Sequence, residues 1–219
     1  MKRDLSIVLA AVCSLAASLA SAQSPRAGEI EYTIGAAHTF SDSVQGLGGS
    51  SINISSRTGI RFGLEYFTSS KLSFGFDATW TEPRYNAVLV PEDGSPDIEA
   101  SYRATIFTGH LTGTYYLLEN ALTPFLEAGL GWTHFDSNVA DGPPITGCWW
   151  DPLWGYICSD FYSTYGATNF SYGAGAGLRW SFGRDRAINA AYRWLEIEAD
   201  GLNKKPVQES LAIEIVFRF

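Results

Sequence analysis

Three histidines, His38, His110 and His134, are the side chains best suited to acid–base chemistry. His134 lies nearest to a hydrolytic arrangement, because Asp136 and Ser137 follow it closely. A serine acts as a nucleophile only when a base lies within hydrogen-bond reach of its hydroxyl. His134 and Ser137 are three positions apart, so on a strand their side chains point to opposite faces. We therefore expect no catalytic site, and neither a metal-ligand spacing nor a phosphate-binding loop indicates a metal or cofactor.

The cysteines indicate a different chemistry, disulfide formation. Cys13 falls in an N-terminal segment described below, which leaves Cys148 and Cys158 as the only pair in the rest of the chain. Thiols in exported proteins meet an oxidising environment and form disulfides. We predict a Cys148–Cys158 bond, which closes a loop of about ten residues and stabilises it by roughly 3 kcal/mol in the chain-entropy model.

Aromatic residues are concentrated around these cysteines. Trp149, Trp150, Trp154 and Tyr156 lie between Cys148 and Cys158. Trp and Tyr dominate the hot spots of protein interfaces, so the rings are candidates for a binding surface. The alternative is that they pack on one another and on the rim of the fold, which leaves two interpretations open.

The N-terminus has the features of a secretory signal peptide. A basic start precedes an apolar run from Leu5 to Leu19, and small residues ending at Ala22 form the cleavage site. We therefore assign residues 1–22 to the signal and residues 23–219 to a single domain. The formal net charge of −8 argues against a nucleic-acid partner, because such proteins need a basic surface.

Apolar and polar residues alternate along most of the mature segment, which indicates β-strands. We expect eight of them, at 29–40, 53–67, 72–80, 101–118, 126–133, 169–182, 187–199 and 207–219. The alternation shifts phase near Trp194 and Leu195, which predicts a bulge or an early exit from the membrane. No run of 18 apolar residues occurs after the signal, so no spanning helix is expected.

The connections between these strands alternate in length. Long loops are expected at 41–51, 84–100 and 136–167, and short turns at 68–71, 119–123 and 183–186. Transmembrane β-barrels have short turns on the periplasmic side and long loops on the outer side. The pattern predicts an all-β, eight-stranded, antiparallel up-and-down barrel with both termini in the periplasm.

Two stretches carry a resemblance to a known family. The last strand ends on Phe219 and resembles the C-terminal signal that the barrel-insertion machinery reads in bacterial outer-membrane barrels. The stretch 173–180, GAGAGLRW, and the overall pattern resemble the small eight-stranded outer-membrane barrels, the group of outer membrane protein A and its surface-protein relatives. The resemblance implies a bacterial outer-membrane location, a monomer, and contact with membrane lipids and lipopolysaccharide.

The charged residues of the strands are expected on the inner face. We predict that Arg61 lies nearly opposite Asp77 and that Arg193 lies opposite Glu214, as structural ion pairs that close the interior. The full inner set is Glu31, Arg57, Arg61, Glu65, Asp77, Glu127, Arg179, Arg193, Glu214 and Arg218. A soluble barrel such as a lipocalin would show the inverse pattern. His110 is expected inside and His38 on the lipid face.

Three functions follow from these observations. The first is a structural or surface-interaction role through the outer loops, notably 136–167, with a host or cell-surface ligand as the partner. The second is a narrow, porin-like channel for ions or small solutes. The third is an enzyme that modifies lipid A, as some barrels of this family are, which would depend on His134 or Ser137. We expect the first.

Overall fold

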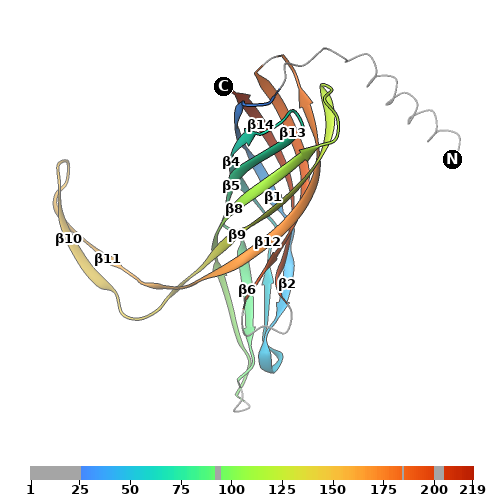
Figure 1. The fold of residues 1–219 in the computed structure, drawn as a ribbon. Coiled ribbons are helices and arrows are strands. Elements are labelled where there is room, and N and C mark those ends of the chain that lie inside the picture. Colours follow the sequence, from blue (N-terminus) through green and yellow to red (C-terminus); the bar gives the residue numbers. More distant parts are fainter. Residues whose placement is uncertain (1–25, 92–94, 184, 200–204) are drawn as a thin grey trace, which may run out of the picture.

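A computed structural model describes residues 26–91, 95–183, 185–199 and 205–219. The predicted signal peptide, with Cys13, lies outside the described residues. Eight antiparallel strands close into a barrel, as predicted, in the order β1-β14-β13-β12-β9-β8-β5-β4 (Figure 1). They are β1 (Ile30–Thr39), β4 (Arg57–Phe67), β5 (Leu72–Thr81), β8 (Thr105–Tyr116), β9 (Leu122–Ala140), β12 (Thr164–Ser181), β13 (Arg186–Ile197) and β14 (Val207–Arg218). Within the described residues, no helix has the length and apolarity needed to span a membrane.

Side chains alternate between an apolar outer wall and a polar interior. In β14, Ile213 and Ile215 point outward with 59% and 45% exposure. The residues that alternate with them, Ala212, Glu214 and Val216, are buried. Strand geometry requires this alternation, because successive side chains point to opposite faces. The arrangement is the inverse of a soluble barrel, whose apolar residues fill the interior.

The barrel closes where the first strand meets the last. Tyr32 pairs with Phe217, and the pairing continues to Thr39 with Ser210. The backbone N–H of Phe219 donates to the carbonyl of Ile30 at 3.1 Å. The C-terminus and the start of β1 therefore lie at the same end of the barrel, which we call the short-turn end (Figure 1). The opposite end is the long-loop end.

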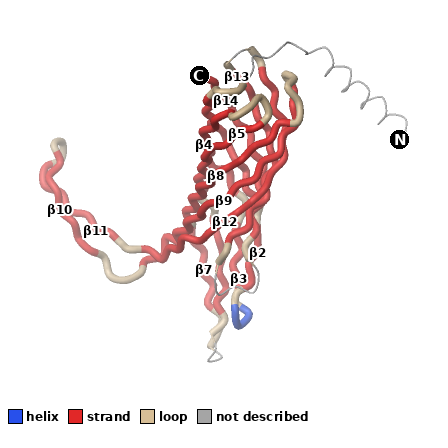
Figure 2. Tube along the Cα trace, in the orientation of Figure 1, coloured by secondary structure: helices blue, strands red, loops and turns tan. Residues whose placement is uncertain are grey.

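The first two long loops are more regular than the sequence indicated. They contain β2 (Asp42–Gln45), a 3₁₀ turn (Leu47–Gly49), β3 (Ser51–Ile54), β6 (Arg84–Leu89) and β7 (Ile98–Arg103). These strands form a second, four-stranded sheet in the order β2-β3-β6-β7 (Figure 2). The long connections expected at 41–51 and 84–100 are present, but the sequence did not reveal their strands, because β3 and β6 pair between loops distant in sequence.

The third long loop also contains strands. The pairing of β9 with β12 continues to Ala140 and Thr164, beyond the predicted loop boundary of 136–167. Beyond it, β10 (Ile145–Asp151) and β11 (Gly155–Phe161) form a separate hairpin. The β9–β12 ribbon leaves the barrel sideways, and the hairpin then curves back toward the level of the barrel wall (Figure 1).

The bulge predicted near Trp194 and Leu195 is not present. Pairing of β12 with β13 runs without a shift from Ser181–Ala187 to Ser171–Ile197. The alternation changes because Leu195 and Ile197 are apolar residues on the inner face, where they line cavities at the mouth of the barrel. The register shift in the β9–β12 pairing lies between Thr164 and Gly166.

Candidate functional site: a charged interior and an aromatic hairpin

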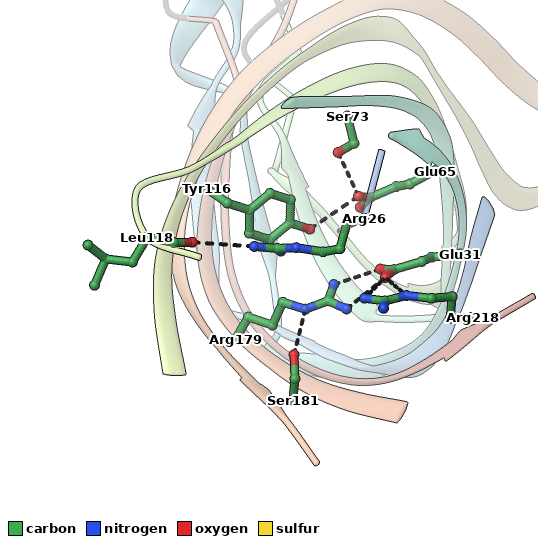
Figure 3. Close-up of polar contacts among 9 residues, drawn as sticks. All are labelled: Arg26, Glu31, Glu65, Ser73, Tyr116, Leu118, Arg179, Ser181 and Arg218. Atoms are coloured by element: carbon green, nitrogen blue, oxygen red, sulfur yellow. Dashed lines mark hydrogen bonds and ion pairs between the residues drawn. The ribbon is translucent and has the colours of Figure 1, made fainter. Parts of the chain in front are cut away.

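Buried ion pairs fill the interior at the short-turn end (Figure 3). Arg179 donates to Glu31 through both terminal nitrogens, Nη1 to Oε2 at 2.7 Å and Nη2 to Oε1 at 2.8 Å. Arg218 Nη2 reaches the same Glu31 Oε1 at 3.0 Å. Arg179 and Glu31 are 2% and 1% exposed, so this two-point contact forms away from water, where such pairs are strongest.

Arg26 and Tyr116 complete this end of the interior. The guanidinium carbon of Arg26 lies 4.5 Å from the centre of the Tyr116 ring, a cation–π contact, and Arg26 Nη2 donates to the carbonyl of Leu118 at 3.3 Å. The Tyr116 hydroxyl donates to Glu65 at 3.2 Å, and the Ser73 hydroxyl donates to the same carboxylate at 2.8 Å. Arg26 could not be recognised as an interior residue from the sequence, because it precedes β1 and lies outside any alternating pattern.

A second network crosses the middle of the barrel. Arg61 Nη2 lies 2.9 Å from Asp77 Oδ2, and Arg193 Nη2 lies 3.0 Å from Glu214 Oε1. The structure thus brings both predicted pairs together. It also joins them, since Arg61 Nε lies 2.8 Å from Glu214 Oε1 and Arg193 contacts Glu127.

The register differs between the two pairs. Arg61 lies nearly opposite Asp77, as predicted, because its backbone partner Thr79 is two positions from Asp77. The prediction that Arg193 lies opposite Glu214 was wrong. The backbone partner of Glu214 is Asn189, and Arg193 pairs with Ser210. The two side chains are therefore offset by four positions along the ladder, and the length of the arginine side chain bridges the offset. Counting residues back from a loop could not reveal this, because the length of the turn between paired residues was unknown.

One predicted interior residue lies elsewhere. Arg57 is exposed, because it begins β4 at the long-loop end, beyond the enclosed part of the barrel. Arg26 lies inside instead, so the described residues place five cations and five acids in the interior. They are Arg26, Arg61, Arg179, Arg193, Arg218, Glu31, Glu65, Asp77, Glu127 and Glu214. The balance of charge suits a sealed interior, in which an unpaired ion is costly.

A small polar cavity lies on the long-loop side of the central network. Its volume is about 60 Å³, and His110, Thr108, Arg61, Asp77 and Arg193 are among its lining residues. This volume exceeds the roughly 10–15 Å³ that a cavity needs to hold one water molecule. Thus the cavity suits bound water.

His110 lies inside the barrel, where the sequence analysis expected it. Its Nε2 lies 2.9 Å from the hydroxyl of Ser171, which also accepts a hydrogen bond from Thr133 at 3.0 Å. The sequence did not reveal this contact, because His110 and Ser171 are far apart in sequence, on β8 and β12, and β9 lies between these strands. Ser171 has no solvent exposure, so a substrate cannot reach its hydroxyl.

The structure does not assemble the residues from His134 to Ser137 into a catalytic group. His134 Nδ1 lies 2.9 Å from the Thr168 hydroxyl, whereas the Ser137 hydroxyl donates to the carbonyl of Tyr165 at 2.7 Å. His38, on the outer wall, lies 3.0 Å from the Thr58 hydroxyl. Among the described residues, no cluster of His, Cys, Asp and Glu is arranged to hold a metal ion.

The hairpin of β10 and β11 carries the cysteines and the aromatic residues. Cys148 and Cys158 are directly paired in the ladder and joined by a disulfide. Trp150 pairs with Tyr156 on the same face, one step closer to the tip. Trp149 points to the other face, where its ring centre lies 6.0 Å from that of Phe161.

The tip of the hairpin is an ordered turn with exposed apolar residues. Asp151 Oδ1 accepts hydrogen bonds from the backbone N–H groups of Leu153 at 2.8 Å and Trp154 at 3.0 Å. Leu153 and Trp154 are 86% and 78% exposed, and Trp150 and Tyr156 are 67% and 72% exposed. Packing of the rings on one another therefore accounts for Trp149 but leaves the other three largely in solvent.

The comparison with protein families decides the identity of the fold. Residues 7–219 match a family model described as the outer membrane protein β-barrel domain. The chain belongs to this family. An outer-membrane β-barrel resides in the bacterial outer membrane, where the apolar outer wall contacts lipid. No curated protein matches the sequence.

Solved structures of other outer-membrane barrels share the fold. Neisserial surface protein A has 18% identity and a TM-score of 0.54 over 87% of this chain and 97% of its own. OprG from Pseudomonas aeruginosa has 15% identity and a TM-score of 0.59 over 88% of this chain and 96% of its own. A third structure is that of Ail, the attachment invasion locus protein of Yersinia pestis, in complex with the heparin analogue sucrose octasulfate. It has 14% identity and a TM-score of 0.50 over 88% of this chain and 99% of its own.

Proposed function

We propose that this outer-membrane β-barrel is a non-catalytic surface-interaction protein that acts through the loop 136–167. In this proposal the long-loop end faces the outside of the cell, and the short-turn end, with both termini, faces the periplasm. The lengths of the connections support this orientation, because transmembrane barrels place their short turns in the periplasm. The barrel is a monomer whose role is to hold the loops above the membrane.

The observation that carries the proposal is the exposed aromatic surface of the β10–β11 hairpin. Trp150, Trp154 and Tyr156 are each about two-thirds or more exposed on a hairpin that a disulfide holds together. Rings fixed on a rigid support lose little conformational entropy on binding, which makes them effective contact residues. Their exposure has no role in stabilising the barrel itself.

The absence of catalysis is part of the proposal. It is supported by the separate hydrogen-bond partners of His134 and Ser137 and by the complete burial of Ser171 beside His110. A lipid A-modifying activity that depends on His134 or Ser137 would overturn this part, and acylation analysis of lipid A from cells with and without the protein would detect it.

The partner on this loop is not expected to be a polyanion. Ail was solved with a heparin analogue, a sulfated sugar. The loop 136–167 of the present chain contains no Lys, Arg or His, and it contains Asp136, Asp141, Asp151 and Asp160. Sulfate and phosphate groups are recognised mainly by arginine and lysine, so this loop has the wrong charge for them.

The test is to replace 145–161 by a Gly–Ser linker and measure binding of the nanodisc-embedded protein to host cells by flow cytometry. We expect the full chain to bind and the variant to lose binding, with Ser159→Ala as a control that leaves the rings in place. Equal binding by the full chain and the linker variant would remove the hairpin as the interaction site.

Insertion through the C-terminus is a further part of the proposal. Phe219 is 80% exposed at the end of β14, and its ring centre lies 5.3 Å from that of Tyr32. Because the terminal phenylalanine contributes little to internal packing, we propose that the insertion machinery reads it. Deletion of Phe219 should lower the amount of folded protein in the outer membrane without preventing refolding in detergent. Normal membrane levels would argue against this role.

A further inference from the structure

The polar groups of the loop are already engaged within it. Asp151 accepts the backbone N–H groups of the hairpin turn. The other three acids of the loop each pair with a hydroxyl in it, in the pairs Asp136 with Thr164, Asp141 with Tyr165 and Asp160 with Thr146. The carboxylates therefore stabilise turns and strand pairs. What the loop presents to a partner is mainly its apolar and aromatic surface.

This surface is concentrated at the tip. Leu153, Trp154, Tyr156 and Trp150 are 86%, 78%, 72% and 67% exposed, whereas Leu126 of the lipid-facing wall is 54% exposed. Each of these tip side chains is therefore more exposed than Leu126, a typical residue of the lipid-facing wall. In water, an ordered cluster of this kind carries a hydrophobic cost that contact with hydrocarbon would remove.

The path of the chain directs the tip back toward the membrane. β9 extends eight residues from Trp132, on the outer wall, to Ala140, which at about 3.3 Å per residue is about 26 Å of strand. Gly142 has a left-handed backbone, with φ of 124°, and two prolines follow it at the bend. From Ile145 to Asp151 the returning strand covers about 20 Å. The ribbon leaves the barrel sideways, so only part of its length leads away from the barrel along its axis, and the returning hairpin lies beside the level of the barrel strands (Figure 1).

We propose that the tip of the β10–β11 hairpin inserts into the outer leaflet of the membrane that holds the barrel. Trp and Tyr suit the boundary between headgroups and hydrocarbon, because their rings are apolar and their N–H and O–H groups remain in contact with water or headgroups. Leu153 reaches deepest in this arrangement, and Asp151, which caps the turn, stays at the headgroups. The hairpin acts as a lateral anchor that fixes the position of the loop over the lipid surface.

This inference rests on the proposed function and changes the role of the rings within it. The aromatic tip contacts the lipid surface, and the hairpin serves recognition by holding the rest of loop 136–167 in position. An external membrane is the main competing occupant. The return of the hairpin alongside its own barrel favours the same membrane. The lack of basic residues means that attraction to anionic lipid does not drive insertion, so it should persist in zwitterionic lipid at high salt.

The experiment uses the full chain, labelled with 5-fluorotryptophan and placed singly in phosphatidylcholine nanodiscs. Fluorine NMR signals are assigned by Trp154→Phe and Trp132→Phe, and Trp132 on the outer wall is the internal reference for lipid contact. A nitroxide on the lipid acyl chain is introduced either into the protein's own disc or into separate vesicles. A water-soluble gadolinium chelate reports exposure to solvent.

We expect the Trp154 signal to be lost with nitroxide in the same disc, as the Trp132 signal is, and to survive the gadolinium chelate at low and high salt. Loss of the Trp154 signal only with nitroxide in separate vesicles would overturn the proposal in favour of an external membrane. A signal lost to the chelate and retained with lipid nitroxide would place the tip in water and also overturn it.

Failure of this inference leaves the proposed function testable. If Trp154 lies in water but the linker variant of 145–161 loses cell binding, the hairpin is a binding element for another partner. If Trp154 lies in the leaflet and cell binding is unchanged, the hairpin is an anchor and the role in recognising cells is wrong.

Discussion

Arginine side chains stabilise the interior by connecting strands that are not neighbours in the ladder. Arg179 on β12 reaches Glu31 on β1, and Arg61 on β4 reaches Glu214 on β14. Each contact spans the barrel interior and complements the backbone pairing around the wall. Alternation along the strands was sufficient to predict that these residues face inward. Their partners could not be predicted, because the partners depend on register and on side-chain length.

Removal of one member of the most buried pair should destabilise the barrel strongly. Arg179→Ala leaves Glu31 buried with a weaker set of donors, and loss of one partner of a buried ion pair costs about 3–5 kcal/mol. Urea unfolding in lipid vesicles measures the free energy of unfolding. Arg57→Ala, at an exposed position outside the interior, is the matched control and should change it by less than about 0.5 kcal/mol. Equal effects of the two variants would show that the interior pairs do not stabilise the fold.

At the scale of elements, close approach of strands depends on small residues of the inner face. Gly131 of β9 lies opposite His110 and Ser171, and a Cβ atom there would overlap the carbonyl oxygen of Gly109. The glycines were visible in the sequence as part of the alternating pattern, but which ones face a backbone was not. The strands inside the long loops were missed for a related reason, since β3 and β6 are held by pairing between two loops.

Gly131→Ala should separate β8 from β9 locally. Overpacking of this kind costs about 1–3 kcal/mol, and amide hydrogen exchange should accelerate at the β8–β9 pairs. Gly113→Ala on β8 is the control, because a Cβ there would meet the Phe74 ring at an ordinary 3.4 Å. Unchanged amide hydrogen exchange in Gly131→Ala would mean that β8 and β9 can accommodate the added methyl group without separating.

For the whole molecule, we propose that the interior is closed rather than conducting, because five cations balance five acids among its described residues. The network at the short-turn end and the central network lie one after the other along the axis, and the cavity between the centre and the long-loop end is only about 60 Å³. The barrel architecture and its polarity were predictable, because alternation and connection lengths are local features. The sideways path of the hairpin could not be predicted from the sequence, because it depends on the bend after Ala140.

Planar-bilayer recordings test whether the interior conducts. We predict no stable conductance steps of porin size from the wild-type chain, because two layers of charged and hydrogen-bonded side chains fill the cross-section of an eight-stranded barrel. The linker variant of 145–161 should behave in the same way, since the hairpin does not contribute to these networks. Regular conductance steps, small or large, would instead support the channel alternative.

The central claim is that the closed barrel is a self-sufficient membrane support and that the hairpin is an appended interaction element. The most direct measurement is the electrophoretic mobility of the refolded linker variant of 145–161, unboiled against boiled. We predict that the unboiled variant migrates faster, with a heat-induced shift equal to that of the full chain. Loss of the shift in the variant would contradict the account, because it would show that the barrel requires the hairpin to fold.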